Sequence, residues 1–340
     1  MKNDLNKFEK RSDESSPKIL FIRFSSFGDI ILASGVVALL KSVYPNSDIT
    51  WIMGKEFAPV FEWRTLANRI IGIDRSGLKG YISMFNLANK LRNITFDIVL
   101  DIQDNRRSAI LLTMLKYIVK TKSMPSLKQR GDDHAYFHFA RILKSIGIDK
   151  IPEKPYLLFN DFDRKSLNEN LYSLGYKDEP LVVFATSASQ SLKRWNIENF
   201  KKLARIITSK NKVSIALIGA KGEEEYGFEG ERIYNLIGKL PYFSSILLIE
   251  KAMLLVTNDS SPLHMAFSVA TPAVVLYGPT RPNWSLPQGP YFAIQSPRDC
   301  SPCMKKRCPE GYGCLDEILP QNVYNVIIKN KEKIGFEFSV

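Results

Sequence analysis

The sequence predicts an α/β fold built from two domains, and three observations support this prediction. Short apolar runs rich in Val, Ile, Leu and Phe alternate with segments of helical periodicity along the chain, as expected for parallel strands joined by crossover helices. The alternation breaks between residues 150 and 180, where Pro152, Pro155, Asp161 and Asp163 interrupt it. The pattern then starts again. We therefore expect two Rossmann-like domains, at residues 18–160 and 161–320, each with a parallel sheet.

The individual elements follow from the same pattern in chain order. Apolar runs predict strands near residues 19–24, 48–52, 69–73 and 96–102 of the first domain, and near 181–184, 213–218, 253–257 and 273–276 of the second. Helical spacing of apolar residues after the first strand continues until Tyr44 and Pro45 stop it. We expect residues 1–17 to form a disordered tail. Residues 321–340 are expected to form a C-terminal helix and tail that could cross back to the first domain.

The composition favours a globular protein without a membrane span. The 340 residues are 45% hydrophobic, which is enough for two cores, and no apolar run approaches the length needed to cross a bilayer. The N-terminal segment MKNDLNKFEKRSDESSP is charged and rich in Ser, unlike a signal peptide. We therefore expect a cytoplasmic protein.

The charge of the chain predicts anionic partners. A net charge of +12 attracts anionic phospholipid, phosphorylated glycolipid or nucleic acid. The chain shows no aromatic RNA-binding signature and no DNA-binding motif, so we expect no nucleic-acid partner. One segment of the first domain is especially basic and contains Lys116, Lys120, Lys122, Lys128 and Arg130. This cluster would suit an anionic glycolipid or membrane surface, and a solvated surface is the alternative.

A strand-to-helix turn, SSFGD, follows the first strand and carries functional side chains. Ser25, Ser26 and Gly28 lie where a helix begins, and a helix N-terminus offers unpaired N–H groups and a positive dipole end to a phosphate. Gly28 permits a close backbone approach. Asp29 does not fit a phosphate cradle because it adds negative charge. It indicates a contact to a substrate hydroxyl instead.

A second turn of this kind lies in residues 256–280, VTNDSSPLHMAFSVATPAVVLYGPT. Asp259, Ser260 and Ser261 precede a helix, and small hydroxyl residues there let a phosphate approach the helix N-terminus. His264 is a candidate donor to a sugar or phosphate. The alternative interpretation is that Asp259 and Ser260 merely cap the helix.

The second domain carries further features of a nucleotide site. Thr186 and Ser187 form a polar loop after a strand, and Lys193 precedes Trp195 and the next helix. A lysine there supplies a movable charge for a diphosphate, although a surface lysine is the alternative. The segment GAKGEEEY does not match the GxGxxG fingerprint of NAD sites. Its carboxylates would repel a pyrophosphate, so Glu223 is expected to contact nucleoside hydroxyls.

The segments SSFGDIILASGVVALLKSVYP, SLKRWNIENF and NDSSPLH, the last followed by TPAVVLYGPT, resemble glycosyltransferase family 9, the bacterial ADP-heptose:lipopolysaccharide heptosyltransferases. The resemblance runs with gaps from about Lys18 to about Val326. It departs from the family at one turn: where the family usually has Gly after Asp-Ser, this chain has Ser261 and then Pro262. Proline is favourable at a helix start but leaves one fewer N–H donor for a phosphate.

The resemblance implies the GT-B architecture, in which two Rossmann-like domains face a central cleft. It further implies inverting, metal-independent transfer of heptose from ADP-heptose to a lipopolysaccharide core acceptor, by an enzyme located peripherally on the inner face of the inner membrane. Asp29 would be the general base. The donor-binding residues would be Ser25, Ser26, Gly28, Thr186, Ser187, Lys193, Glu223, Asp259, Ser260, Ser261 and His264. The alternatives are transfer of another nucleotide-linked sugar to a glycolipid or glycan, and a catalytically silent sugar-nucleotide-binding homologue.

Three groups of residues could hold a metal. The DxD sequence Asp161-Phe162-Asp163 has no strand before it, so helix capping is the better interpretation. His134 and His138 lie one helical turn apart but lack the Glu of HExxH, and packing or acceptor contacts are expected. The four cysteines, Cys300, Cys303, Cys308 and Cys314, lie in one short segment. Their clustering favours a structural zinc, with reduced thiols and disulfides as alternatives. No cofactor is expected for catalysis.

Overall fold

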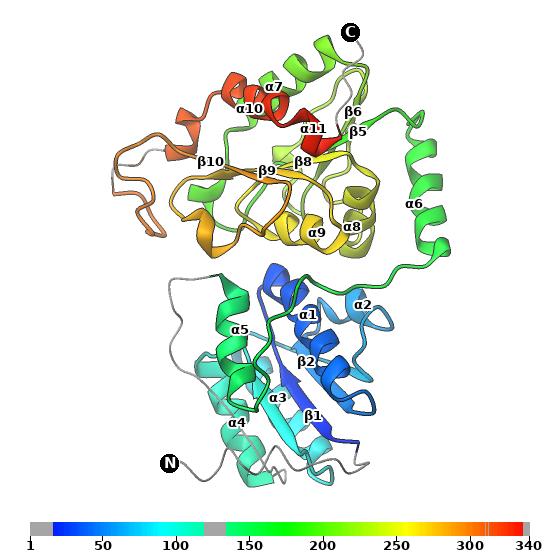
Figure 1. Cartoon of the computed structure of the whole chain (residues 1–340), viewed down its shortest axis with the longest axis vertical. Helices are drawn as coiled ribbons and strands as arrows, with labels where there is room; N and C mark the ends of the chain where they lie inside the picture. The colour runs from blue at the N-terminus through cyan, green and yellow to red at the C-terminus, as the bar shows by residue number, and fades with distance from the viewer. Residues whose placement is uncertain (1–15, 119–133, 310, 312, 336–340) are drawn as a thin grey trace. The chain divides into compact units, whose positions relative to one another are not determined.

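The computed structural model describes residues 16–118, 134–309, 311 and 313–335. It divides into two compact units between Leu158 and Phe159, and Figure 1 shows the elements of each unit. The predicted tail, up to residue 15, lies outside the described residues. No helix within the described ranges combines the length and the hydropathy of a membrane span.

The first unit contains a four-stranded parallel sheet with the order β3-β2-β1-β4. Its strands are β1 (Lys18–Ile22), β2 (Asp48–Gly54), β3 (Arg69–Ile73) and β4 (Ile98–Asp101), so the four predicted strands are confirmed. The chain leaves β1 towards β2 on one side and returns to β4 on the other. Ligands of open α/β sheets bind at the carboxyl ends of the strands beside such a reversal. The SSFGD turn, which follows β1, lies at this point.

Helices cover both faces of the first sheet: α1 (Phe27–Val43), α2 (Ala58–Phe61), α3 (Gly77–Leu91), α4 (Arg106–Ile118) and α5 (Ala135–Lys144). α3 and α4 pack side by side and bury Met84, Leu87, Leu111 and Leu115 against the strands. α1 packs with α5. Right-handed crossovers place α1 on the opposite face from α3, because β1-to-β2 and β3-to-β4 run in opposite directions across the sheet.

The second unit contains a six-stranded parallel sheet with the order β10-β9-β8-β5-β6-β7. Its strands are β5 (Leu181–Ala185), β6 (Ser214–Ile218), β7 (Ile233–Asn235), β8 (Leu254–Asn258), β9 (Ala273–Tyr277) and β10 (Tyr291–Gln295). The four strands predicted here are confirmed. β7 and β10 were not predicted; both are edge strands and mostly only partly buried, and β7 is only three residues long. The strand order reverses between β5 and β8, which marks the expected ligand edge of this sheet.

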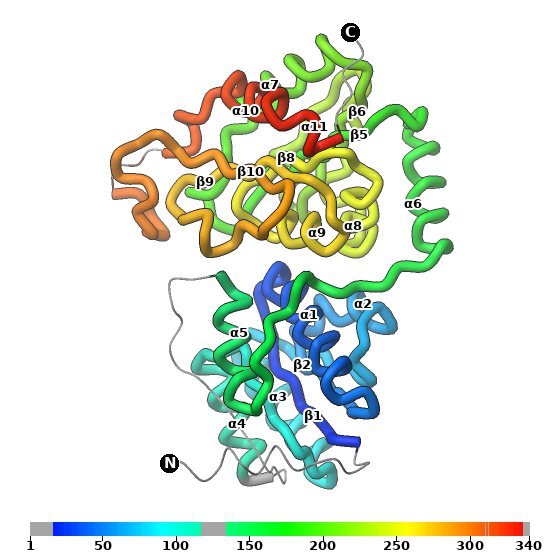
Figure 2. Tube along the Cα trace, viewed as in Figure 1, coloured from blue at the N-terminus to red at the C-terminus, as the bar shows by residue number. Residues whose placement is uncertain are grey.

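The second unit also contains α6 (Asp161–Ser173), α7 (Ile197–Lys210), α8 (Tyr242–Lys251), α9 (Ser261–Val269), α10 (Pro320–Lys329), α11 (Lys331–Ile334) and the short 3₁₀ turns η2 (Ser191–Lys193), η3 (Glu224–Tyr226), η4 (Pro282–Trp284) and η5 (Cys314–Glu317). The C-terminal helix α10 lies beside α7, although the two are far apart in sequence (Figure 2). Its Val323 and Ile327 join the core of the second unit. The apolar face of α10 is therefore buried within this unit.

Candidate functional site

In the first unit, the SSFGD turn holds Asp29 in a defined orientation. Asp29 lies in the first turn of α1, and its Oδ2 accepts hydrogen bonds from the Ser26 backbone N–H at 3.1 Å and from Ser26 Oγ at 2.9 Å. Arg23 Nη2 lies 2.7 Å from the same oxygen. The carboxylate is therefore bound to the helix start and to a guanidinium, as a capping side chain with a charge partner.

Arg23 and Gln103 fix this turn to the neighbouring strand, and the sequence did not reveal either residue. Arg23 is buried and donates to the carbonyl of Ile102, just after β4. Gln103 Oε1 accepts from the N–H groups of Phe24 at 2.7 Å and Ser25 at 3.0 Å. Both residues lie at the β1–β4 reversal, so their role depends on strand order. The one sequence signal for these two residues is that each is a polar residue directly after an apolar run.

In the second unit, Lys193 and Asp259 form a nearly buried ion pair. Lys193 Nζ lies 2.6 Å from Asp259 Oδ2, and the two side chains are 19% and 9% exposed. Thr280 donates to Oδ2 at 2.6 Å and Ser285 to Oδ1 at 2.7 Å. Burial by itself raises the pKa of Asp259, but the charge of Lys193 and these hydrogen bonds outweigh it and lower the pKa below the usual value. Asp259 thus stays ionised and fixes the position of the lysine ammonium.

The start of α9 lies directly after this pair. Ser260 occupies the N-cap position with an extended backbone, and Pro262 lies in the first turn. The Ser260 side chain makes no capping hydrogen bond at this helix start. The carboxylate of Asp259 contacts Lys193, Thr280 and Ser285 instead. The structure therefore does not support the interpretation that Asp259 caps the helix, and the positive end of α9 can receive an anion. His264 lies within α9, one turn further on.

Asn258, at the end of β8, links the loops around the site and was not singled out from the sequence. Its Oδ1 accepts from the Trp195 N–H at 3.0 Å, and its Nδ2 donates to the Thr186 carbonyl at 3.2 Å. The Thr186 hydroxyl is buried and has no hydrogen-bond partner in the described part of the chain. Asn258 thereby brings the loop after β5, the segment before α7 and the start of α9 to one edge of the sheet.

Glu223 lies at the same edge but is bound by the protein itself. Its Oε2 accepts from Ser187 Oγ at 2.6 Å and from the Ala220 N–H at 2.9 Å. Arg194 lies 3.9 Å from Oε1 and donates to the hydroxyl of Tyr226. Glu223 and Ser187, both predicted donor contacts, are thus hydrogen-bonded to one another. Any nucleoside contact of Glu223 would add to these bonds.

The residues of the DxD sequence and the two histidines have local structural roles. Asn160 is the N-cap of α6 and accepts from the Asp163 N–H at 2.8 Å, which places Asp161 and Asp163 in the first helical turn. The DxD residues therefore lie at a helix start, but the capping side chain is that of Asn160 and not, as predicted, one of the two aspartates. His134 is the N-cap of α5, and His138 is buried in that helix. Within the basic cluster, Lys116 is exposed near the end of α4, while Lys120, Lys122, Lys128 and Arg130 lie outside the described residues.

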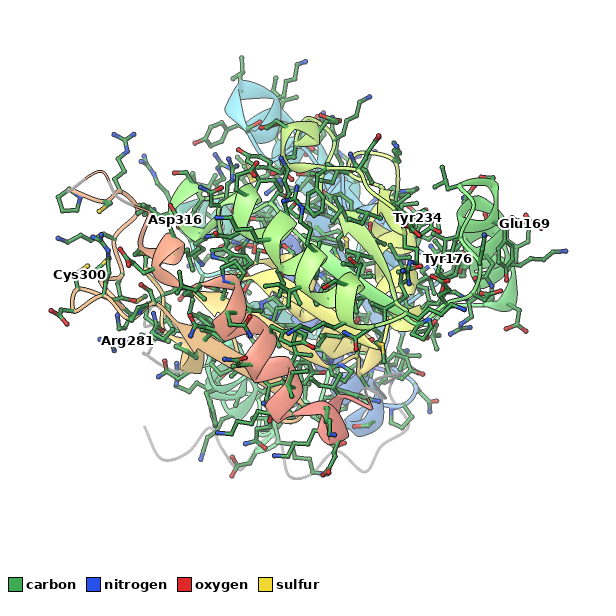
Figure 3. All side chains as sticks on the ribbon, turned by 90° about the horizontal axis from the view of Figure 1, so that it is seen from above. Glu169, Tyr176, Tyr234, Arg281, Cys300 and Asp316 are labelled. Atoms are coloured by element: carbon green, nitrogen blue, oxygen red, sulfur yellow. The ribbon has the colours of Figure 1, made fainter. Side chains whose placement is uncertain are left out.

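The four cysteines are free thiols in the structure. Cys300 is exposed and lies at the periphery of the second unit, on the opposite side from Tyr176 and Glu169 (Figure 3). Cys314 is buried, and burial together with the neighbouring Cys303 and Cys300 raises its pKa. In the described part of the chain, no three His, Cys, Asp or Glu side chains are arranged to hold a metal. Zinc in this loop therefore stays a prediction.

The two sites offer complementary chemistry. The second unit places a lysine ammonium, a helix N-terminus and a buried hydroxyl at one sheet edge, which suits an anionic diphosphate. The first unit places a carboxylate at the carboxyl end of its central strand, where it can accept a proton.

Comparison with known proteins shows which family the chain belongs to. The model of glycosyltransferase family 9 (heptosyltransferase) matches residues 84–312. The chain is 25% identical over 276 residues to lipopolysaccharide heptosyltransferase 3 of Escherichia coli K12, covering 74% of this chain and 80% of that protein.

Solved structures share the fold. The family 9 glycosyl transferase of Veillonella parvula DSM 2008 has a TM-score of 0.79 at 21% identity, over 94% of this chain and 98% of that one. The E. coli heptosyltransferase WaaC, solved with ADP, has a TM-score of 0.69 at 18% identity, over 92% and 99% of the two chains. The predicted α/β fold of GT-B type, with a parallel sheet in each Rossmann-like unit, is confirmed. Because the family model matches more than half of the chain, the protein belongs to glycosyltransferase family 9 and is a glycosyltransferase.

Proposed function

We propose that this enzyme transfers heptose from ADP-heptose to a lipopolysaccharide core acceptor, with inversion at the anomeric carbon and without a catalytic metal. The observation that carries the proposal is the match to a lipopolysaccharide heptosyltransferase over 80% of that protein's length. The WaaC structure, with a similar fold, was solved with ADP, which supports an ADP-linked donor. The cationic and helix-terminal groups of the second unit supply the complementary site.

The donor diphosphate would bind to Lys193 and the start of α9. A charge-assisted hydrogen bond from lysine contributes about 1.5–3 kcal/mol, and a helix N-terminus about 0.3–1 kcal/mol. Lys193 is therefore the dominant group. Asp259 acts through it as a positioning residue, because its carboxylate lies 2.6 Å from the ammonium. Ser260, Ser261 and the buried Thr186 hydroxyl are available for further contacts with the donor.

The reaction needs one base and one stabilised leaving group. In the proposed step, the acceptor hydroxyl oxygen forms a bond to the anomeric carbon while the bond from that carbon to the diphosphate oxygen breaks. The hydroxyl proton passes to Asp29, and the bonding electron pair leaves with ADP. The ammonium and the helix dipole stabilise the charge that grows on ADP. An aspartate is a weak base, but the hydroxyl becomes strongly acidic as the new bond forms, so a weak base suffices.

Release of ADP tests the proposed function. The enzyme is incubated with ADP-heptose and a lipid A core acceptor, and ADP is measured with and without the acceptor. We expect release that depends on the acceptor, with one heptose added to the product. Release that is the same without acceptor would indicate hydrolysis, and no release at all would indicate a sugar-nucleotide-binding homologue without activity.

We further propose a structural zinc bound by the four-cysteine loop, as their spacing within residues 300–314 suggests. The thiols range from exposed to buried, so binding would draw the exposed Cys300 towards the others. Metal analysis of protein purified without added zinc tests this proposal. A stoichiometry near zero would leave reduced thiols as the correct interpretation.

A further inference from the structure

One surface of the first unit has an unusual composition for a solvated helix. Four large side chains of α3, Leu78, Tyr81, Ile82 and Phe85, are exposed, from 44% for Tyr81 to 76% for Leu78. They are spaced i, i+3, i+4 and i+7, so they share one side of the helix. We call these four residues the α3 stripe.

The neighbouring side of the same helix is already packed. Met84, Leu87, Ala88 and Leu91 are buried against the sheet. A helix that is apolar on both sides normally has both sides covered, and exposed contiguous apolar patches mark interaction surfaces. The α3 stripe is therefore expected to be covered by a binding partner, because the core of this unit does not cover it.

The charge around the stripe identifies the chemistry of that occupant. α3 carries Lys79 and Lys90, both exposed, and contains no Asp or Glu. The adjacent helix α4 begins with the exposed Arg106 and Arg107, and its sequence also lacks acidic residues. Apolar and aromatic side chains beside basic ones are the pattern of an interfacial helix on an anionic bilayer. A protein partner would not require both helices to lack acidic residues.

The position of the stripe fits an acceptor that is anchored in lipid. α3 begins four residues after β3 ends, and the stripe occupies its first half. The stripe therefore lies near the carboxyl edge of the parallel sheet, the edge at which the SSFGD turn follows β1. A bilayer on the stripe would lie beside the edge that carries Asp29.

We propose that the α3 stripe, with Lys79 and Lys90, docks the enzyme on an anionic phospholipid bilayer. This inference rests on the proposed transfer to a glycolipid and deepens it. Leu78, Ile82 and Phe85 enter the boundary between headgroups and acyl chains, Tyr81 lies at headgroup level, and the lysines contact lipid phosphates. The enzyme then takes its acceptor from the surface on which it is docked.

Vesicle binding by the full chain tests the proposal without donor or acceptor. We compare phosphatidylethanolamine vesicles containing phosphatidylglycerol with vesicles of phosphatidylcholine, and expect binding to the anionic vesicles. The double variant Ile82→Glu/Phe85→Glu should lower that binding by about tenfold or more, and Lys79→Gln/Lys90→Gln by about fivefold for each lysine. The matched control, Phe162→Glu/Leu174→Glu, changes two exposed apolar side chains of the second unit and should bind like the unchanged enzyme.

The outcomes separate this inference from the proposed function. All variants should keep the melting temperature and the rate with a soluble, acyl-free acceptor, and the Ile82→Glu/Phe85→Glu variant should show a raised KM only for acceptor embedded in vesicles. Unchanged vesicle binding in that variant would overturn the inference. So would a dimer of the unchanged enzyme, seen by sedimentation, that the variant dissociates. If the enzyme binds anionic vesicles through the stripe but transfers no heptose, the proposed function fails and the docking surface stands.

Discussion

At the scale of single residues, Asp29 and Lys193 are two charged side chains whose positions are fixed by neighbouring side chains and which are proposed to act on the substrates. Asp29 is bound by Ser26 and Arg23 in the first unit. Lys193 is bound by Asp259 in the second. A carboxylate that is already hydrogen-bonded and paired changes little in position when a substrate arrives, which favours catalysis by orientation.

We predict that Asp29→Asn lowers the turnover rate by about 10²–10⁴-fold and leaves ADP affinity nearly unchanged. The amide can still accept from the Ser26 N–H, but it cannot take the proton of the acceptor hydroxyl. Steady-state kinetics and calorimetric titration with ADP measure the two quantities, and the melting temperature reports the cost of leaving Arg23 without its ion pair. If ADP affinity collapses together with the rate, Asp29 is a structural residue or a donor ligand.

Replacement of Lys193 with Ala should weaken donor binding and lower kcat together. Its ammonium stabilises the diphosphate in the ground state and more strongly as the leaving charge grows. Loss of a charge-assisted hydrogen bond corresponds to about a tenfold to hundredfold fall in kcat/KM. The control is Lys201→Ala in the same unit, which removes an exposed pair with Glu198 and should leave the kinetics unchanged. Normal kinetics in Lys193→Ala would exclude its contact with the diphosphate.

The lowered pKa of Asp259 predicts how Lys193 affects stability at different pH. A carboxyl group whose folded-state pKa is lowered contributes stability above its unfolded pKa, and this contribution is lost as the pH falls through the folded-state pKa. Without Lys193, burial is the main remaining effect and raises the pKa. We therefore expect the difference in melting temperature between the unchanged enzyme and Lys193→Met to be larger near pH 7 than near pH 4. A constant difference would show that the pair does not titrate as described.

At the scale of elements, the two strand-to-helix turns have different constructions. The turn before α1 is satisfied internally by Asp29 and Ser26. At the turn before α9, the neighbouring carboxylate of Asp259 binds other side chains, and Pro262 lies in the first turn. The start of α9 is therefore the better anion site. It offers one fewer backbone donor than usual, because Pro262 has no N–H.

We predict that Pro262→Ala raises the affinity for ADP. Alanine restores one backbone donor at the helix start, and one hydrogen bond contributes about 0.5–1.5 kcal/mol, or roughly twofold to tenfold in affinity. The same change should lower the melting temperature slightly, because proline restricts the unfolded chain. Calorimetric titration with ADP measures the affinity. Equal affinities would mean that the diphosphate does not contact this turn.

At the scale of the whole molecule, a measurement of the melting temperature with different nucleotide sugars tests the identity of the donor. A ligand present at about one hundred times its dissociation constant stabilises the folded protein by about 2.7 kcal/mol. ADP-heptose and other ADP-sugars should therefore raise the melting temperature of the full chain clearly, while UDP-sugars at the same concentration should not. The reverse result would show that the proposed donor is wrong and would favour transfer of a UDP-linked sugar.

The sequence by itself determined the fold class and the kinds of side chain present at the candidate site. Eight strands were predicted from apolar runs. Seven of them are buried almost throughout, and a strand covered on both faces must be apolar throughout; the edge strand β3 is the exception. The edge strands β7 and β10 were not predicted; both are mostly only partly buried, and β7 is only three residues long. Ser25, Asp29, Lys193 and Asp259 were recognisable because polar residues follow strands at those points.

Only the tertiary structure decided which of these residues meet and what holds them. The Lys193–Asp259 pair spans 66 positions of sequence, and the contacts of Gln103 with Phe24 and Ser25 depend on β4 lying beside β1. Neither follows from local pattern, because strand order is set by the packing of the whole sheet. The α3 stripe shows the same limit: its spacing is visible in the sequence, but packing alone decides that Met84 and Leu87 face the core while Leu78 and Phe85 face outward.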